Sequence, residues 1–262
     1  MERRQLKRII IIILVILNGF LSLYLIRRRV AERAAAYRAE QNLLELFAAD
    51  GVSISPDIIP RGDPPSVVRL SLDGETQDRA AAFFLGADAE PAQQGGVRVY
   101  ASGGGSARFH ADGSFAATGL SLQGDPEEIC REFCRNWSYA PPDAIDDGEA
   151  VMTAKYGNVS VFNCGVCLLF DGDTLSEAFG TLLPRTGTPG DAPKLDAMGA
   201  LAIFQAKRRE SRAVSAEIRR VSLRYSLQSS DDDGLTLVPA WRVETDTADY
   251  YVNCVTGALM FS

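Results

Sequence analysis

Five cysteines are the residues whose type and spacing could do chemistry in this chain. Cys130 and Cys134 are four residues apart, Cys164 and Cys167 form a CxxC motif, and Cys254 lies near the C-terminus. Four thiolates could hold zinc, and a CxxC pair could carry out redox chemistry. The wide separation of the two pairs and the lack of a βαβ pattern around the CxxC favour buried free thiols or structural disulfides instead. The odd count leaves at least one thiol unpaired.

Three further motifs are weaker candidates for a site. The single histidine, His110, lies in an alternating strand-like segment with no nucleophile motif nearby, so we expect an ordinary strand residue. Gly103–Gly105 lack the lysine and the helix of a phosphate loop and indicate a flexible turn. Asp231–Gly234 lack the closing glutamate of a calcium loop and indicate a solvated turn. We therefore expect no enzyme active site, no cofactor and no metal.

An uncharged run of 18 residues, residues 9–26, opens with five isoleucines and predicts a transmembrane helix. At about 1.5 Å per residue it would span roughly 27 Å, close to the ~30 Å thickness of the hydrocarbon layer. A cleavable secretory signal also begins basic and apolar, but its apolar region has only about 7–15 residues. Basic residues flank the run on both sides: Arg3, Arg4, Lys7 and Arg8 before it, and Arg27, Arg28 and Arg29 after it.

The charge of the rest of the chain indicates the orientation of this anchor. Residues 1–39 hold 9 of the 27 Lys and Arg residues and 2 of the 34 Asp and Glu residues, which leaves a net charge of −14 for residues 40–262. We expect residues 1–8 to be a short cytoplasmic basic segment and the acidic remainder to lie outside the cell membrane. Such an acidic domain is not expected to bind nucleic acid or an anionic membrane surface.

The anchor helix is predicted to continue as a juxtamembrane helical stalk over residues 27–50. The segment is rich in Ala, Glu, Arg and Leu, and Asp50-Gly51 supplies a C-terminal stop. Four prolines between residues 56 and 65 then indicate an irregular crossing into the globular part.

The remaining pattern predicts an α+β fold of antiparallel sheets packed with helices, in three units: 51–122, 123–185 and 194–262. Helices are expected at 75–85, at 125–137 with Asp125 as N-cap, and at 195–209. Their expected buried residues include Ala80, Ala81, Phe83 and Phe84 in the first helix, and Met198, Leu201, Ala202 and Phe204 in the third. Strands are expected at 67–72, 97–101, 107–118, 150–156, 159–163, 166–170, 218–227, 235–244 and 250–255. Residues 186–193 are expected to form a linker or long loop.

Two segments resemble a known family. Residues 155–163 read KYGNVSVFN, and residues 237–257 contain VPAWRV followed by YYVNCVTG. These hairpins are similar to those of the YycH/YycI-type accessory regulators of the WalK sensor histidine kinase, and the second is also similar to PepSY-like domains. Cys254 stands where the family usually has Ala, and residues 51–120 carry no matching motif.

The resemblance implies a non-enzymatic, single-pass membrane protein that regulates a two-component sensor kinase by protein contact, with a second accessory protein of the same type as a further partner. Asn18, Gly19, Ser22 and Leu25 are the expected partner-binding residues in the anchor, because small residues permit close helix packing and an amide can form hydrogen bonds in lipid. Three alternatives remain open: a passive tether, a PepSY-like module that binds ligands or inhibits a peptidase, and a thiol enzyme using Cys164 and Cys167.

Overall fold

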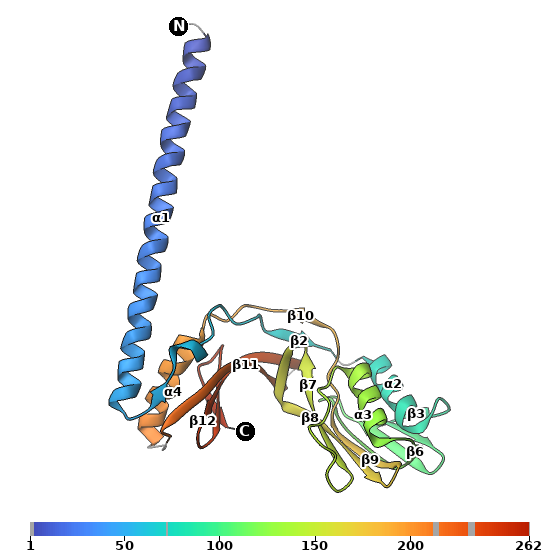
Figure 1. The fold of residues 1–262 in the computed structure, drawn as a ribbon. Helices are drawn as coiled ribbons and strands as arrows, with labels where there is room; N and C mark the ends of the chain where they lie inside the picture. Colours follow the sequence, from blue (N-terminus) through green and yellow to red (C-terminus); the bar gives the residue numbers. More distant parts are fainter. Residues whose placement is uncertain (1–2, 72, 212–214, 230–233, 262) are drawn as a thin grey trace. The chain divides into compact units, whose positions relative to one another are not determined.

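The computed structural model describes residues 3–71, 73–211, 215–229 and 234–261, without the side chains of residues 3–12, 15, 16, 29, 32, 33, 93, 94 and 211. The described chain divides into two compact units, Met1–Pro56 and Asp57–Ser262 (Figure 1). The acidic turn predicted at residues 231–233 lies outside the described residues.

The first unit is dominated by one uninterrupted helix, α1 (Arg3–Ala49), followed by β1 (Ser53–Ile54). The helix covers both the predicted anchor and the predicted stalk. It ends where Asp50-Gly51 predicted, because Gly51 adopts a positive φ of 72° and its N–H donates to the carbonyl of Ala48. In the part of the chain that the structure describes, no helix is both long enough and apolar enough to cross a membrane. The predicted anchor at 9–26 falls partly outside that part, since several of its side chains are not described.

The second unit begins within the short helix η1 (Pro56–Ile58) and is a mixed α+β fold in which helices pack on a large sheet. Its strand order is β10-β2-β12-β11-β8-β9-β6-β5-β4-β3, with β7 paired to β8, β13 to β12, and β14 to β13. Neighbouring strands are antiparallel except β8 and β11, which share one parallel pair, Tyr225 with Val161.

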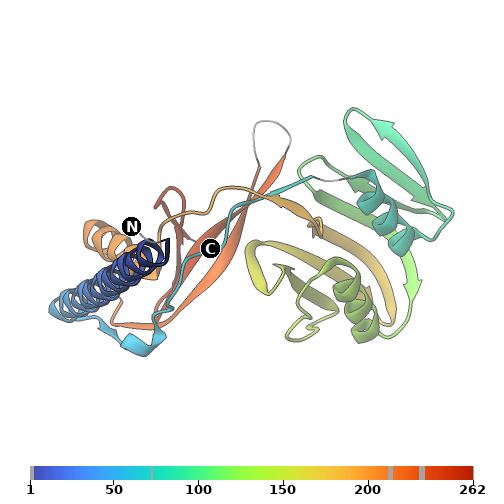
Figure 2. The same ribbon diagram turned by 90° about the horizontal axis from the view of Figure 1, so that it is seen from above.

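The first half of this sheet contains two meanders that follow two helices. Helix α2 (Gly74–Leu85) precedes β3 (Glu90–Gln94), β4 (Val97–Ser102), β5 (Gly105–Phe109) and β6 (Ser114–Gln123). Helix α3 (Pro126–Trp137) precedes β7 (Glu149–Tyr156), β8 (Val159–Asp171) and β9 (Thr174–Thr181). Because β6 pairs with β9, the strands of the first two predicted units lie in one sheet. Both helices lie side by side on one face of it (Figure 2).

Local signals explain where these two helices begin. The side chain of Asp73 accepts a hydrogen bond of 2.8 Å from the N–H of Thr76, which caps α2. Asp125 caps α3 in the same way, and Pro126 occupies the first turn, where its missing N–H removes no helical bond. Phe84 is buried as predicted, whereas Phe83 is only partly buried.

An aromatic cluster forms the core beneath the two helices. Phe133 of α3 is fully buried, and its ring lies 4.8–6.0 Å from those of Phe83, Phe84, Trp137 and Tyr139. Phe84 also stacks on Phe115 of β6. Aromatic burial of this size supplies much of the hydrophobic stabilisation of a domain.

The second half of the sheet consists of two long strands, β11 (Glu217–Ser229) and β12 (Leu235–Thr245), with β13 (Asp249–Asn253) and β14 (Leu259–Phe261) beyond them. Helix α4 (Ala197–Ser211) covers one face, where the indole N–H of Trp241 donates to the carbonyl of Leu195 at 3.0 Å. Leu201 and Phe204 of α4 are buried as predicted, but Ala202 is exposed and Met198 only partly buried. The inward face of α4 is therefore rotated from the predicted one.

The structure corrects the prediction of a break at Cys164-Gly165. Strand β8 runs through both residues, and Gly165 pairs with Thr153 of β7. A Cβ atom at Gly180 of β9 would lie 2.3 Å from the carbonyl oxygen of Gly165. These glycines therefore permit close approach of neighbouring strands, and Gly165 does not form a turn.

Five of the described strands were not expected from the sequence: β1, β3, β9, β10 (Gly187–Pro189) and β14. Strand β10 lies inside the predicted linker and pairs with β2 (Val68–Leu70), far away in the sequence. Strand β3 contains Glu, Pro and Gln, residues with low strand propensity, and it exists because it pairs with β4.

Candidate functional site

The predicted partner-binding residues all lie on α1. Asn18, Ser22 and Leu25 share one helix face by their spacing and are exposed, and nothing lies within 4 Å of a Cβ atom placed on Gly19. The amide nitrogen of Asn18 donates to the carbonyl of Leu14 at 3.0 Å, so the side chain is oriented by its own helix. This arrangement leaves the amide oxygen of Asn18 as an acceptor directed away from that bond.

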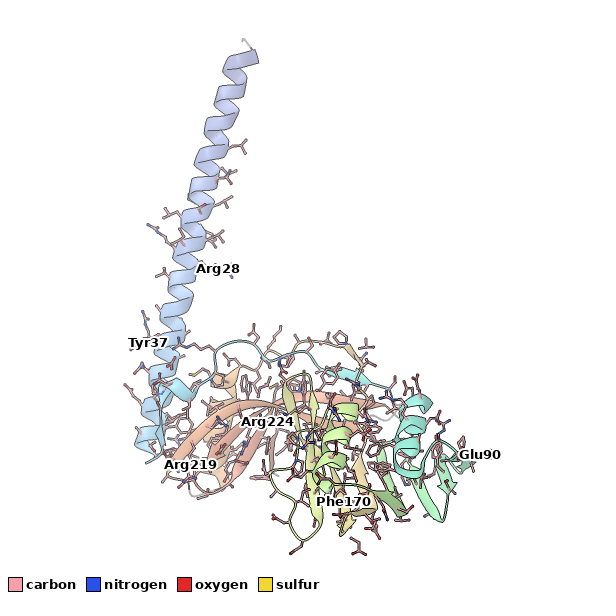
Figure 3. All side chains as sticks on the ribbon, turned by 45° about the vertical axis from the view of Figure 1, so that its right-hand side comes forward. Arg28, Tyr37, Glu90, Phe170, Arg219 and Arg224 are labelled. Carbon is pink, nitrogen blue, oxygen red and sulfur yellow. The ribbon has the colours of Figure 1, made fainter. Side chains whose placement is uncertain are left out.

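The basic residues after the uncharged run continue along the same helix. Figure 3 labels Arg28 and Tyr37 on this stretch of α1, where both side chains are exposed.

The cysteines are all free thiols. Cys130 and Cys134 lie on α3, Cys164 and Cys167 lie on β8, and Cys254 follows β13. Burial raises the pKa of every one of them, to about 11 for Cys130 and to about 12 for Cys164, Cys167 and Cys254. It also raises the pKa of Cys134. Thiols with such pKa values stay protonated at neutral pH, and a protonated thiol is a weak nucleophile.

The CxxC motif does not bring its two sulfur atoms together. Residues three apart on an extended strand are separated by roughly 10 Å and point to opposite faces, whereas a disulfide needs Cα atoms within about 7 Å. Cys164 Sγ lies 3.5 Å from the carbonyl oxygen of Thr181, and Cys167 Sγ lies 3.3 Å from a carboxylate oxygen of Glu149. Each thiol thus packs in a different environment, which removes the geometric basis of a thiol-disulfide enzyme at this motif.

A cavity of about 380 Å³ lies between α3 and the segment that follows it. Glu127, Cys130 and Arg131 line it from the helix, and residues 141–145 line it from the loop. Cys130 is 1% exposed, and its protonated thiol behaves as a small apolar group. Glu127 and Arg131 give the rim of this cavity one acidic and one basic side chain.

The structure also shows where the other motifs named from the sequence lie. His110 is exposed at the end of β5, and Gly103 and Gly104 form the turn between β4 and β5 with positive φ values of 59° and 94°. Within the described ranges, no group of three or more His, Cys, Asp and Glu side chains could hold a metal ion.

A group of charged side chains on the C-terminal strands was not expected from the sequence. Arg242 of β12 donates from Nε and Nη2 to one carboxylate oxygen of Asp249, at 3.0 and 2.7 Å, and Nη2 lies 3.3 Å from Glu244. The alternation of charged residues along β11 and β12 is a sequence signal that could have indicated this face, because residues two apart on a strand share one side.

Comparisons with known proteins do not assign the chain to a family. No protein family and no curated protein matches the sequence. Similar solved structures include an uncharacterized protein from Eubacterium rectale, with 10% identity and a TM-score of 0.41, covering 77% of this chain and 86% of that one. Another is the C-terminal domain of YpeB from Bacillus megaterium, with 13% identity and a TM-score of 0.33, covering 73% of this chain and 98% of that one. Neither similarity is close enough to carry an argument about function.

Proposed function

We propose that this chain is a membrane-tethered, non-enzymatic regulator that acts by protein contact, and that its partner is a sensor histidine kinase. The observation that carries the proposal is the uncharged run of residues 9–26 between two groups of basic residues, attached to an acidic globular part. The kinase as partner rests on the resemblance of residues 155–163 and 237–257 to the YycH/YycI-type regulators.

The proposed contact lies within the bilayer, on the helix face of Asn18, Ser22 and Leu25. Lipid supplies no hydrophobic drive for helix association, so close packing at small residues and hydrogen bonds between helices must provide it. Asn18 and Ser22 offer both a side chain small enough for close packing and a group that can form a hydrogen bond to another helix. Packing of this face against kinase helices would favour one signalling state, and the outer unit would control how the helix is presented.

A regulator of this kind needs no reactive group, and the buried thiols with raised pKa values are consistent with that. The competing function is a PepSY-like module that binds a ligand or inhibits a peptidase at the cell surface, with α1 as a passive tether. Loss of kinase binding when α1 is substituted would distinguish the regulator from the PepSY-like module, because a passive tether tolerates substitution of its lipid-facing residues.

The experiment is co-purification of the kinase from membranes with the full-length chain. Asn18→Leu combined with Ser22→Leu should lower recovery of the kinase a few-fold to about tenfold, since each interhelical hydrogen bond contributes on average about 0.6 kcal/mol. Insertion should not suffer, because leucine is favourable in the bilayer. The control variant, Phe20→Leu with Tyr24→Leu, has the same spacing on the opposite helix face and should leave recovery unchanged.

Two outcomes would contradict the proposal. Unchanged recovery with the Asn18 and Ser22 double variant, together with its loss on deletion of residues 57–262, would place recognition outside the membrane. Protection of those residues from protease in intact cells would contradict the topology.

A further inference from the structure

Strands β7, β8 and β9 carry a row of apolar side chains on the face of the sheet that lies away from α2 and α3. Both helices lie on the other face (Figure 2). The register pairs Val151 of β7 with Cys167 of β8, and Cys167 with Phe179 of β9. Side chains that are paired across antiparallel strands share a face and lie about 4.5–5.5 Å apart at Cβ. The three side chains therefore form one continuous row.

This apolar row is open to solvent. The side chains of Val151 and Phe179 are 59% and 45% exposed, and Cys167 lies between them. Among the described residues of Asp57–Ser262, two other large apolar side chains are exposed, Val255 and Phe261, and both lie in the C-terminal hairpin of β13 and β14. Single exposed apolar side chains are normal, but large ones that are neighbours on one face mark an interaction site.

Two carboxylates border the apolar row. In the next row of the same face, Glu149 of β7 pairs with Leu169 of β8, and Leu169 pairs with Glu177 of β9. Both glutamates are exposed, and Leu169 is partly buried. The thiol of Cys167 donates to a carboxylate oxygen of Glu149 at 3.3 Å, which holds that carboxylate beside the apolar row. Within the described ranges, neither glutamate lies within 4.0 Å of a basic side chain.

We name these two rows together the open patch; its residues are Glu149, Val151, Cys167, Leu169, Glu177 and Phe179. The patch combines apolar surface, which gains free energy when it leaves water, with carboxylates that have no cationic partner. A group that covers it must therefore be apolar at its centre and positive at its edge.

We propose that the open patch binds a segment of a partner protein in which an apolar side chain lies between two basic ones. The apolar side chain packs on Val151, Cys167 and Phe179. The basic side chains pair with Glu149 and Glu177, which are two strands, or about 9.6 Å, apart. In an extended segment alternate residues lie on one side, so a basic-x-apolar-x-basic sequence directs all three side chains to the patch.

The charge of the patch decides against two other occupants. Unpaired carboxylates repel an anionic partner such as nucleic acid. A second copy bound by two-fold symmetry would place the patch against itself, and Glu149 and Glu177 of both copies would then meet. Arg108 of β5 lies on the same face but two strands away from Phe179, so it does not neutralise them. Each copy also carries a net charge of −14 in residues 40–262.

The inference goes beyond the proposed function and does not depend on it. The open patch belongs to Asp57–Ser262, whereas the proposed kinase contact lies on α1. Binding at the patch needs neither a membrane nor a kinase.

The test is a ligand-detected NMR titration of the full-length protein in mild detergent at low salt. The probe is the peptide Ac-Arg-Ser-Phe-Ser-Arg-NH2, and two comparison peptides replace either both arginines by glutamate or the phenylalanine by serine. We expect the probe to bind, the serine peptide to bind at least about fivefold more weakly, and the glutamate peptide not to bind. Raising the salt concentration from about 0.05 M to about 0.5 M should weaken binding of the probe about threefold.

Substitutions in the open patch should weaken binding of the probe. Val151→Ser and Phe179→Ser should each weaken it at least about fivefold, because they remove the apolar surface that the phenylalanine covers. Glu149→Gln combined with Glu177→Gln should weaken it about fivefold and remove most of its salt dependence, because the size of the side chains is kept and only the charge is lost.

The matched control is Val255→Ser. Val255 is 57% exposed, close to the value for Val151, but lies outside the open patch, so binding should change by less than about twofold. Thermal melting shows whether each variant is folded. The glutamine double variant removes no apolar side chain and keeps the proposal testable if a serine variant unfolds.

Any of four results would overturn the proposal. These are no binding of the probe, equal binding of the probe and the glutamate peptide, equal losses in Val151→Ser and Val255→Ser, and a dimer in sedimentation experiments that Phe179→Ser abolishes. The last result would assign the open patch to a second copy and contradict the charge argument.

Discussion

The two halves of the sheet in Asp57–Ser262 both pack a face against helices, yet they use their side chains differently. In the half made of β3–β9, α2 and α3 meet over an aromatic cluster centred on Phe133, and burial dominates. In the half made of β11–β14, α4 covers one face while the other carries arginines, carboxylates and the unpartnered hydroxyl of Ser222.

This difference indicates that the first half is the main source of stability. Buried polar groups that lack partners reduce stability, and natural proteins keep such groups mainly at functional or strained sites. A half with a dense aromatic core can stabilise a neighbour that carries such groups, because the two are joined in one sheet through β8 and β11. The three predictions below test that comparison, from the largest expected effect to the smallest.

Phe133→Ala should lower the free energy of unfolding by about 3–5 kcal/mol, because it removes a fully buried ring and leaves a cavity among four other rings. Chemical denaturation monitored by circular dichroism measures the loss. Phe179→Ala is the matched control: Phe179 is 45% exposed on β9, so the loss should be about 1 kcal/mol or less. An equal or larger loss for Phe204→Ala in α4 would show that the first half is not the main source of stability.

Asn163→Ala should lower the free energy of unfolding by about 1–2 kcal/mol, because the side chain joins the two halves. Its amide accepts from the N–H of Leu227 at 2.7 Å and donates to the carbonyl of Leu227 at 2.8 Å, as a neighbouring strand would. Asn163→Asp keeps the acceptor but loses the donor, so it should also be destabilising. Gln228→Ala, at an exposed position of β11, is the control. If Asn163→Ala lowers the free energy of unfolding no more than Gln228→Ala does, the packing of the two halves does not depend on this side chain.

The buried thiol of Cys254 should make the folded state less stable at alkaline pH. Burial raises the pKa of its thiol from about 9 to about 12, so the folded state keeps the proton that the unfolded state releases. The stabilisation is complete below pH 9 and is lost as the pH rises from 9 towards 12, with a loss of roughly 1 kcal/mol at pH 10.

The variant Cys254→Ala lacks this titration, so the difference in stability between it and the parent protein should shrink as the pH rises from 8 to 10. Denaturation curves at both pH values measure it. A constant difference would show that Cys254 does not contribute to the alkaline loss.

Elements with local signals could be predicted from the sequence. The cap at Asp125 defines the start of α3, and Asp50-Gly51 defines the end of α1. These signals act between residues that are neighbours in the chain, so their physics is already contained in a short sequence window.

Elements that depend on distant partners could not be predicted in this way. Strand β3 has a composition unfavourable for strands and forms against β4, and β10 forms against β2. The glycine of the CxxC segment suggested a turn, but its pairing with Thr153 of β7 keeps it extended. Pairing free energy from other parts of the chain outweighs local preference at such positions.

The sequence by itself determined the uncharged run, the acidic remainder, the α+β order of elements, and the alternation that places Arg220, Ser222 and Arg224 on one side of a strand. Only the tertiary structure decided which side chains meet there. The register of β11, β12 and β13 places Arg242 beside its two carboxylates and leaves Arg224 opposite Ala240. A shift of one residue would move each of these side chains to the other face, and register is fixed by long-range pairing and burial that no local pattern contains.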